Sequence, residues 1–223
     1  IRCAYVAMCS LFLAREQVWM VNGYPLEGEW GTYATGKAGD LLQPRGFAAQ
    51  DFSGAAANET SWLRLLMGGV TADVIFVNSK GNTDFFDLTE GRGHPYDAPI
   101  LNTPAIVQFI HSWSMNKPGD GACVGGAWIE RGAYAAVGSV HEPFLSAFVP
   151  PGEIANRCVN LIPYLIAARW WDGQHPLGKP WRVMTYGDPL MLCAPPAPPP
   201  DGVGKARISM PLESGVDLTE RVK

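Results

Sequence analysis

Six short runs of apolar residues constrain the fold of this chain more than any other feature. Several of them are continuous rather than alternating, which is typical of central parallel strands that are covered on both faces. The six predicted strands are Val18–Asn22, Gly46–Phe52, Val74–Asn78, Ile106–His111, Ala135–Val140 and Val183–Tyr186.

Stretches with helical periodicity lie between these runs. We expect helices at Thr32–Leu42, Glu59–Met67, Ala122–Arg131 and Glu153–Trp171. Pro163 should kink or divide the last of them, because proline cannot donate the helical hydrogen bond. Strands that alternate with helices predict a parallel, doubly wound sheet. The sequence therefore predicts a three-layer α/β domain with a mostly parallel sheet of six strands.

Length and composition fit this fold. A chain of 223 residues suits one large domain, and 47% apolar with 17% charged residues excludes a disordered chain. The net charge of −4 provides no basic surface for nucleic acid, so we expect no nucleic-acid partner. Asn58 begins an Asn-Glu-Thr triplet, which fits either a glycosylation acceptor or the cap of the helix that follows.

Both ends of the chain differ from the middle. The first residue is Ile, so we expect the numbering to begin inside a longer or processed product. The apolar run Ile1–Leu13 is too short to span a bilayer and predicts a core helix or a remnant of a signal sequence. No other run is long enough, so we expect no transmembrane segment.

The C-terminal run Ala194–Pro200 (APPAPPP) predicts polyproline II. We expect the domain to occupy residues 1–193 and a Pro-rich linker with a C-terminal arm to occupy 194–223, where Val203–Met210 could supply an edge strand.

Motifs for metals and common cofactors are absent from the sequence. The five cysteines form no CxxC or CxxH pair, so we expect no metal site, and isolated cysteines in apolar runs are usually buried. Neither a P-loop nor HExxH nor GxSxG occurs. We therefore expect no cofactor, and the redox compartment stays open.

Sites in open parallel sheets form beyond the carboxyl ends of the strands. Four predicted loops lie at such positions, at Ser79–Asn82, Ser112–Ser114, His141–Pro143 and Gly187–Leu190. These loops hold most of the candidate catalytic residues. We expect His111, at the end of an apolar strand, to be a hydrogen-bonded core histidine.

The stretch from Val74 to Leu192 resembles the catalytic domain of gingipain-type cysteine peptidases in the caspase-like clan. The shared features, in order, are an apolar strand with a polar-Gly turn, a Pro-led strand, a glycine-rich segment and a Gly-Asp-Pro-Leu turn. They correspond to Val74–Gly81, Asn102–Ser112, Gly132–Ser139 and Gly187–Leu190.

This resemblance implies a catalytic His before the glycine after the third strand, and a nucleophilic Cys just after the fourth. Lys80 stands at the first position, and Ser112 or Ser114 stands at the second. A lysine with an ordinary pKa near 10.4 is charged at neutral pH and is no base. The resemblance therefore implies a caspase-like fold without the usual catalytic pair.

Three functions compatible with these residues remain. The first is an inactive peptidase-like domain that binds a protein or peptide, or acts as a scaffold. The second is a hydrolase that uses a Ser–Lys pair of Lys80 with Ser112 or Ser114, or a Cys–His pair of Cys123 with His141. The third is a structural module without a functional cleft.

The sequence leaves the oligomeric state undetermined. The family resemblance slightly favours a secreted or cell-envelope location. A protein or peptide is the expected partner.

Overall fold

The computed structural model describes residues 4, 5, 7, 15–170 and 182–193. The predicted C-terminal arm, its edge strand at Val203–Met210 and most of the run Ile1–Leu13 lie outside the described residues. Among the first residues, Ala4, Tyr5 and Ala7 are helical.

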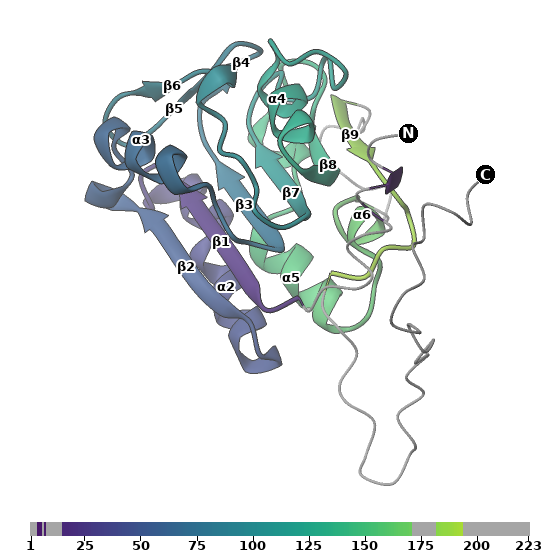
Figure 1. Cartoon of the computed structure of the whole chain (residues 1–223). Helices are drawn as coiled ribbons and strands as arrows, with labels where there is room; N and C mark the ends of the chain where they lie inside the picture. Colours follow the sequence, from purple (N-terminus) through teal and green to yellow (C-terminus); the bar gives the residue numbers. More distant parts are fainter. Residues whose placement is uncertain (1–3, 6, 8–14, 171–181, 194–223) are drawn as a thin grey trace, which may run out of the picture.

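A six-stranded sheet forms the centre of the molecule (Figure 1). Its strands, in spatial order, are β2 (Ala48–Ser53), β1 (Gln17–Asn22), β3 (Val74–Asn78), β7 (Ala105–Ile110), β8 (Ala133–Ser139) and β9 (Val183–Tyr186). All six predicted strands are confirmed, with small differences at their ends. Neighbouring strands are parallel except β8 and β9, which are antiparallel.

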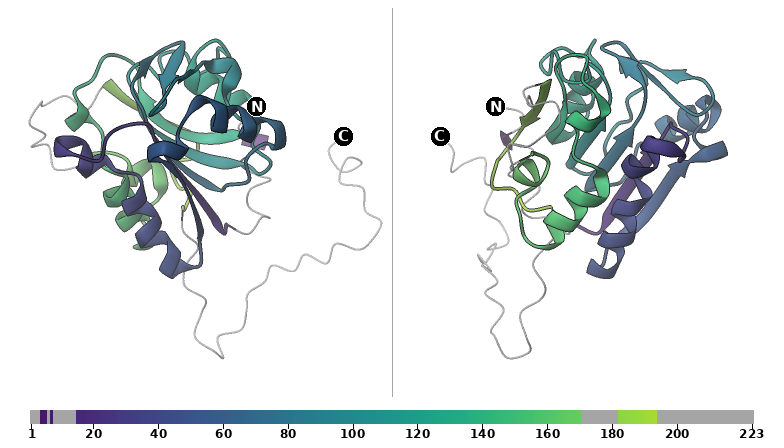
Figure 2. Two further views of the ribbon diagram at one scale, coloured as in Figure 1. Left: turned by 90° about the vertical axis from the view of Figure 1, so that its left-hand side faces the viewer. Right: turned by 180° about the vertical axis from the view of Figure 1, so that it is seen from behind.

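Helices cover both faces of this sheet, which gives three layers (Figure 2). One face packs against α2 (Gly36–Leu42), α5 (Pro151–Val159) and α6 (Tyr164–Ala167). The other packs against α3 (Glu59–Gly68) and α4 (Val124–Glu130). The predicted α/β class and mostly parallel sheet are confirmed.

Local sequence signals explain several element ends. The Asn58 side chain accepts a hydrogen bond of 2.9 Å from Ser61 N and so caps α3, while its amide nitrogen donates to the Ala55 carbonyl at 2.8 Å. Pro163 separates α5 from α6, as its missing N–H predicts. The predicted helix Thr32–Leu42 is divided into a 3₁₀ turn and α2. The 3₁₀ turns are η1 (Gly28–Tyr33), η2 (Gln43–Arg45), η3 (Gly54–Ala56), η4 (Pro95–Asp97) and η5 (Leu145–Ala147).

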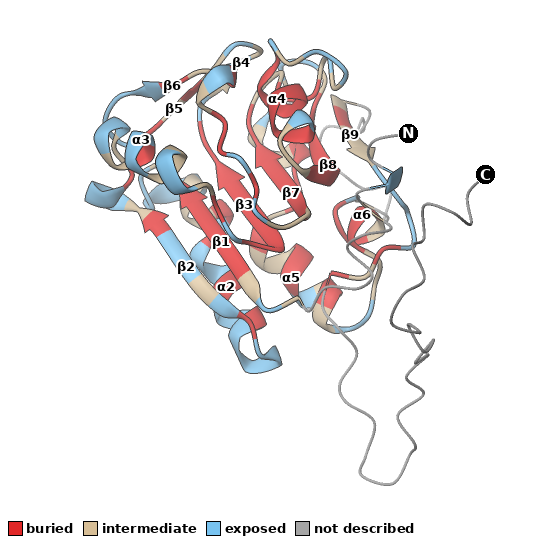
Figure 3. Cartoon of the chain, in the orientation of Figure 1, coloured by how far each residue is buried: buried red, intermediate tan, exposed pale blue. Residues whose placement is uncertain are grey.

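An aromatic cluster fills the core between the sheet and α3–α4. The Trp62 ring stacks on Trp19 at 5.5 Å between centroids, and Trp128 lies 6.4 Å from Trp62. All three side chains are buried. The central strands are buried along their length, whereas the edge strand β2 is largely exposed (Figure 3). Burial on both faces explains why the central strands are continuous apolar runs.

A second, small sheet lies between β3 and β7 in the sequence. It consists of β4 (Gly81–Asn82), β5 (Phe85–Asp87) and β6 (Arg92–Gly93), which pair in an antiparallel manner. The sequence did not predict it. Within the described parts of the chain, no helix is long and apolar enough to cross a membrane.

Candidate binding pocket at the carboxyl edge of the sheet

A pocket of about 460 Å³ opens at the edge of the sheet where the parallel strands end. The register aligns Asn22, Asn78 and Ile110 across β1, β3 and β7, so the loops that follow these strands leave from the same edge. Such an edge is the usual ligand site of open parallel sheets. The lining residues come from the loops after β1, β3, β7 and β8 and from β5: Tyr24, Trp30, Ser79, Lys80, Gly81, Phe85, Asp87, Ile110, His111, Ser112, Glu142, Pro143, Leu145 and Phe148.

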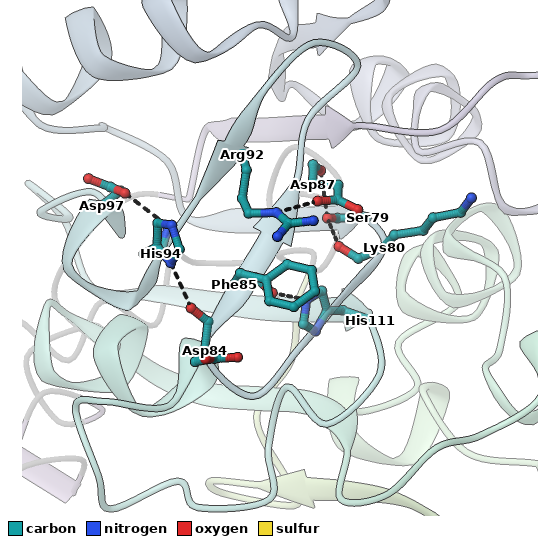
Figure 4. A network of polar contacts seen from close by, with 9 residues as sticks. All are labelled: Ser79, Lys80, Asp84, Phe85, Asp87, Arg92, His94, Asp97 and His111. Carbon is teal, nitrogen blue, oxygen red and sulfur yellow. Dashed lines mark hydrogen bonds and ion pairs between the residues drawn. The ribbon is translucent and has the colours of Figure 1, made fainter.

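The turn after β3 is fixed by hydrogen bonds to the small sheet. Ser79 Oγ lies 2.7 Å from the carbonyl oxygens of both Lys80 and Asp87, which share its single proton, and Asp87 N donates to the Lys80 carbonyl at 2.7 Å. The Lys80 backbone is therefore held in place, whereas its side chain extends away from Asp87 and His111 (Figure 4). Lys80 Nζ lies 5.5 Å from the centre of the Tyr24 ring.

His111 lies at the end of β7, buried against this turn. Its Nε2 atom and the Phe85 carbonyl oxygen are 2.9 Å apart (Figure 4). Because a carbonyl only accepts, Nε2 carries the proton. Burial lowers the pKa of His111 from 6.5 to about 4, against the opposing effects of the Phe85 hydrogen bond and the charge of Asp87. The ring is therefore neutral at neutral pH. The prediction of a hydrogen-bonded core histidine is confirmed.

Ser112 is paired with a carboxylate. Its Oγ donates to Glu142 Oε1 at 3.0 Å, and Trp113 Nε1 donates to Glu142 Oε2 at 3.2 Å. Both oxygens of Glu142 thus hold the loop after β7. The His141 ring packs 4.4 Å from the Trp113 ring, centre to centre. This contact lies beside the pocket, because neither Trp113 nor His141 lines it.

Ser114 and Cys123 are buried, and both side chains contact backbone groups. Ser114 Oγ donates to the His111 carbonyl at 3.0 Å and accepts from Ser139 N at 3.1 Å, which ties the loop after β7 to β8. Cys123 Sγ lies 3.1 Å from the Ser114 carbonyl and 3.2 Å from Asn116 Oδ1. Neither side chain lines the pocket.

Two aromatic residues, Tyr24 and Trp30, line the pocket and form what we call the aromatic wall. The two rings stack with centroids 3.8 Å apart and planes 11° from parallel. Burial raises the pKa of Tyr24 well above its ordinary value, and the negative charges of Asp87 and Glu142 raise it further. The phenol is therefore a neutral hydrogen-bonding group beside two carboxylates.

The charges around the pocket are partly paired. Arg92 Nε bonds Asp87 Oδ1 at 2.8 Å, and the Arg92 guanidinium lies 3.8 Å from the centre of the Phe85 ring. Lys80 forms no ion pair with any residue in the described parts of the chain. The pocket thus offers one ammonium group that a ligand can engage.

The structure brings only two of the five predicted site residues together in the pocket. Lys80 and Ser112 both line it, but no hydrogen bond between described residues joins Lys80 to Ser112 or Ser114. None joins Cys123 to His141 either. Whether any of the five takes part in catalysis stays a prediction.

One predicted site loop lies elsewhere. Gly187–Leu190 follows β9, and β9 runs antiparallel to β8, so this loop leaves from the opposite edge of the sheet. The prediction that this loop lies at the carboxyl edge with the other three loops is wrong.

The sequence analysis did not predict the aromatic wall of Tyr24 and Trp30. The rule that selected the other loops applies equally to the loop after β1, which supplies Tyr24 and Trp30.

We found no match to this chain among models of protein families, among curated proteins or among solved structures. Among the described residues, no group of three or more His, Cys, Asp or Glu side chains is placed to hold a metal ion.

Proposed function

We propose that this chain is a gingipain-type domain of the caspase-like clan that has lost its catalytic pair and binds a peptide segment of a protein partner in the pocket. The observation that carries the proposal is the position of Lys80 and Ser112. By the resemblance, Lys80 stands at the position of the expected His, and Ser112 or Ser114 stands at that of the expected Cys. Lys80 and Ser112 line one pocket without forming a base–nucleophile pair.

The chemistry of the pocket argues against catalysis by these groups. A serine hydroxyl needs a base that can take its proton, and the Ser112 hydroxyl is directed to an exposed carboxylate instead. His111 lies next to it in the sequence, yet its protonated nitrogen faces the Phe85 carbonyl. A peptidase that uses substituted residues is therefore the less favoured function.

The pocket offers the groups that recognise a peptide. The stacked rings of Tyr24 and Trp30 provide apolar area with polar edges, and Lys80 provides a cation for a carboxylate or carbonyl. Leu26 and Phe144, next in sequence to the lining loops, are 59% and 65% exposed. Exposed apolar side chains near a polar pocket favour a polypeptide over a small polar metabolite.

Selection from a library of random peptides tests the binding proposal. Enriched peptides are labelled, and their affinity is measured by fluorescence polarisation on the full chain. Trp30→Ala should weaken binding about tenfold or more, because aromatic anchors dominate such interfaces. Leu63→Ala, an exposed change on α3, is the matched control and should leave affinity unchanged. Enriched peptides that bind both variants equally well would place binding outside the pocket.

Covalent probes test the competing function. The chain is treated with a fluorophosphonate and with a thiol-directed epoxide, and labelled residues are located by mass spectrometry. We expect no labelling at Ser112 or Cys123 and no cleavage of the selected peptides. Labelling at either residue together with cleavage that Ser112→Ala or Cys123→Ala abolishes would establish a hydrolase. A chain that neither binds a peptide nor reacts would be a structural module.

A further inference from the structure

Two buried cysteines from distant parts of the sequence meet in the core, on the side of the sheet away from β4–β6. Cys158 lies in the last turn of α5, and Cys193 follows β9. Their exposed fractions are 1% and 0%, and both belong to one hydrophobic cluster with Tyr164. Each is a free thiol in this structure.

The two thiols lie close enough to affect each other's ionisation. The neighbouring Cys193 thiol and burial raise the pKa of the Cys158 thiol, while burial and the two sulfur groups raise the pKa of Tyr164. The backbone reinforces this proximity, because Tyr164 N donates to the Met191 carbonyl at 2.8 Å and so fixes the segment after β9 against the start of α6. Figure 1 shows this segment passing beside α6.

We propose that Cys158 and Cys193 form a disulfide bond under oxidising conditions, which ties the segment after β9 to the end of α5. Such a bond requires two cysteines whose backbones lie close together, as the shared buried cluster and the Tyr164–Met191 hydrogen bond indicate for this pair. The third described cysteine, Cys123, is bonded to Ser114 and Asn116 in the opposite layer and has no cysteine partner among the described residues.

The reaction is a thiol–disulfide exchange with a small disulfide such as oxidised glutathione. One cysteine thiolate attacks the oxidant, forms a mixed disulfide and releases one reduced thiol. The second cysteine, as its thiolate, then attacks the protein sulfur of the mixed disulfide and releases the other reduced thiol. Two electrons pass to the oxidant, which also takes up the two protons as it becomes two thiols.

Burial governs the rate of this exchange. The pKa of the Cys158 thiol is raised well above its ordinary value by its hydrogen bond to Cys193 and by burial, and a neutral thiol is a poor nucleophile. The segment after β9 must therefore open before the oxidant enters. We expect the bond to form readily as the chain folds and slowly once it has folded.

The bond would close a ring that contains α6 and β9. Cys193 directly precedes the Pro-rich run Ala194–Pro200, so the disulfide would anchor the domain at the point where that run begins. This proposal is independent of the pocket. Peptide binding and disulfide formation are measured separately, and either can fail without the other.

Mass spectrometry of the full chain tests the proposal. The chain is refolded in glutathione buffers of graded redox potential, free thiols are blocked with N-ethylmaleimide in denaturant, and the protein is digested with trypsin. The expected product joins the peptide 158–169 to the peptide 183–205, each of which holds one cysteine. Cys123→Ser should leave this product unchanged. Cys193 free at every potential, or joined to another cysteine, would overturn the proposal.

Thermal unfolding of the oxidised and reduced chain gives a second measurement. Oxidised wild-type chain should unfold at a temperature about 5–10 °C above the reduced chain, because the ring restricts the unfolded state. Cys158→Ser and Cys193→Ala should each abolish the response to oxidant, whatever their own stability. An equal response in wild type and in either variant would show that another cysteine pair is responsible.

Discussion

Gly81 packs so closely against His111 that any side chain at position 81 would overlap the imidazole. A Cβ atom there would collide with His111 Nε2 and with the Phe85 carbonyl oxygen, the two atoms that form the hydrogen bond at the back of the pocket. Gly81 thus joins the turn after β3 to the end of β7.

Gly81→Ala should consequently destabilise the fold. The collision forces either the histidine or β5 to move, and overpacking of this kind costs about 1–3 kcal/mol. Urea denaturation measures the free energy of unfolding. Gly36→Ala is the matched control, because a Cβ atom at this helical position meets nothing within 4 Å. It should be neutral or slightly stabilising. Equal effects of the two changes would contradict the close packing.

Stability should fall as the pH falls from about 6.5 towards 4. In this range the unfolded His111 is protonated, while the folded one, with its pKa near 4, stays neutral. Unfolding therefore takes up a proton, and the free energy of unfolding decreases by about 3 kcal/mol across the range. Above pH 6.5 the contribution is constant.

Denaturation curves at pH 7 and pH 4.5 isolate this contribution. His111→Gln removes the titrating group and should flatten the pH dependence. His141→Gln removes an exposed histidine instead and should leave it as in the wild type. If the free energy of unfolding of the His111 variant fell with pH as steeply as that of the wild type, carboxylates would be the source of the acid sensitivity.

Trp62 should be among the most sensitive core positions. Its side chain is 1% exposed, contacts Trp19 and Trp128, and donates from Nε1 to the Asp97 carbonyl at 2.8 Å. Trp62→Ala should cost about 3–5 kcal/mol, since it leaves a cavity and an unpaired carbonyl. The adjacent Leu63 is 45% exposed, and Leu63→Ala should change stability by less than about 0.5 kcal/mol. Calorimetric unfolding separates the two, and comparable losses would argue against the aromatic core.

Asn58→Ala should destabilise the start of α3 by about 1 kcal/mol, because Ser61 N loses its acceptor. Asn58→Asp keeps an acceptor oxygen and should retain most of the stability. Chemical denaturation of both variants distinguishes the cap from a purely polar effect. A loss that is equal in the two would show that the amide donation to Ala55 is the bond that matters.

The main sheet was predictable because its central strands β1, β3, β7 and β8 are buried on both faces, and each is therefore a continuous apolar run in the sequence. The small sheet was not predictable. Gly81–Asn82 and Arg92–Gly93 are only two residues long and polar, so they carry no periodicity. The reversed direction of β9 is also absent from the local sequence, since Val183–Tyr186 has the same apolar character as a parallel strand.

The position of the pocket was predictable in part, because it depends on the order and direction of the parallel strands. Lys80 and Ser112 follow neighbouring parallel strands, and this topology alone brings them to one edge. The predicted pairing of Cys123 with His141 was different, because it depended on the directions of the two side chains, and these directions give them different contacts. The thiol faces the Ser114 carbonyl, and the imidazole rests on Trp113. No spacing in the sequence reports these directions.

The reversal of β9 has a practical consequence. Because β9 starts opposite Ser139 and ends opposite Ala136, the chain travels away from the pocket before it reaches Cys193. A fluorophore joined to the segment directly after β9 would be attached at the edge of the sheet remote from the pocket. Immobilised through that segment on a sensor chip, the domain would present its pocket to the flowing solution.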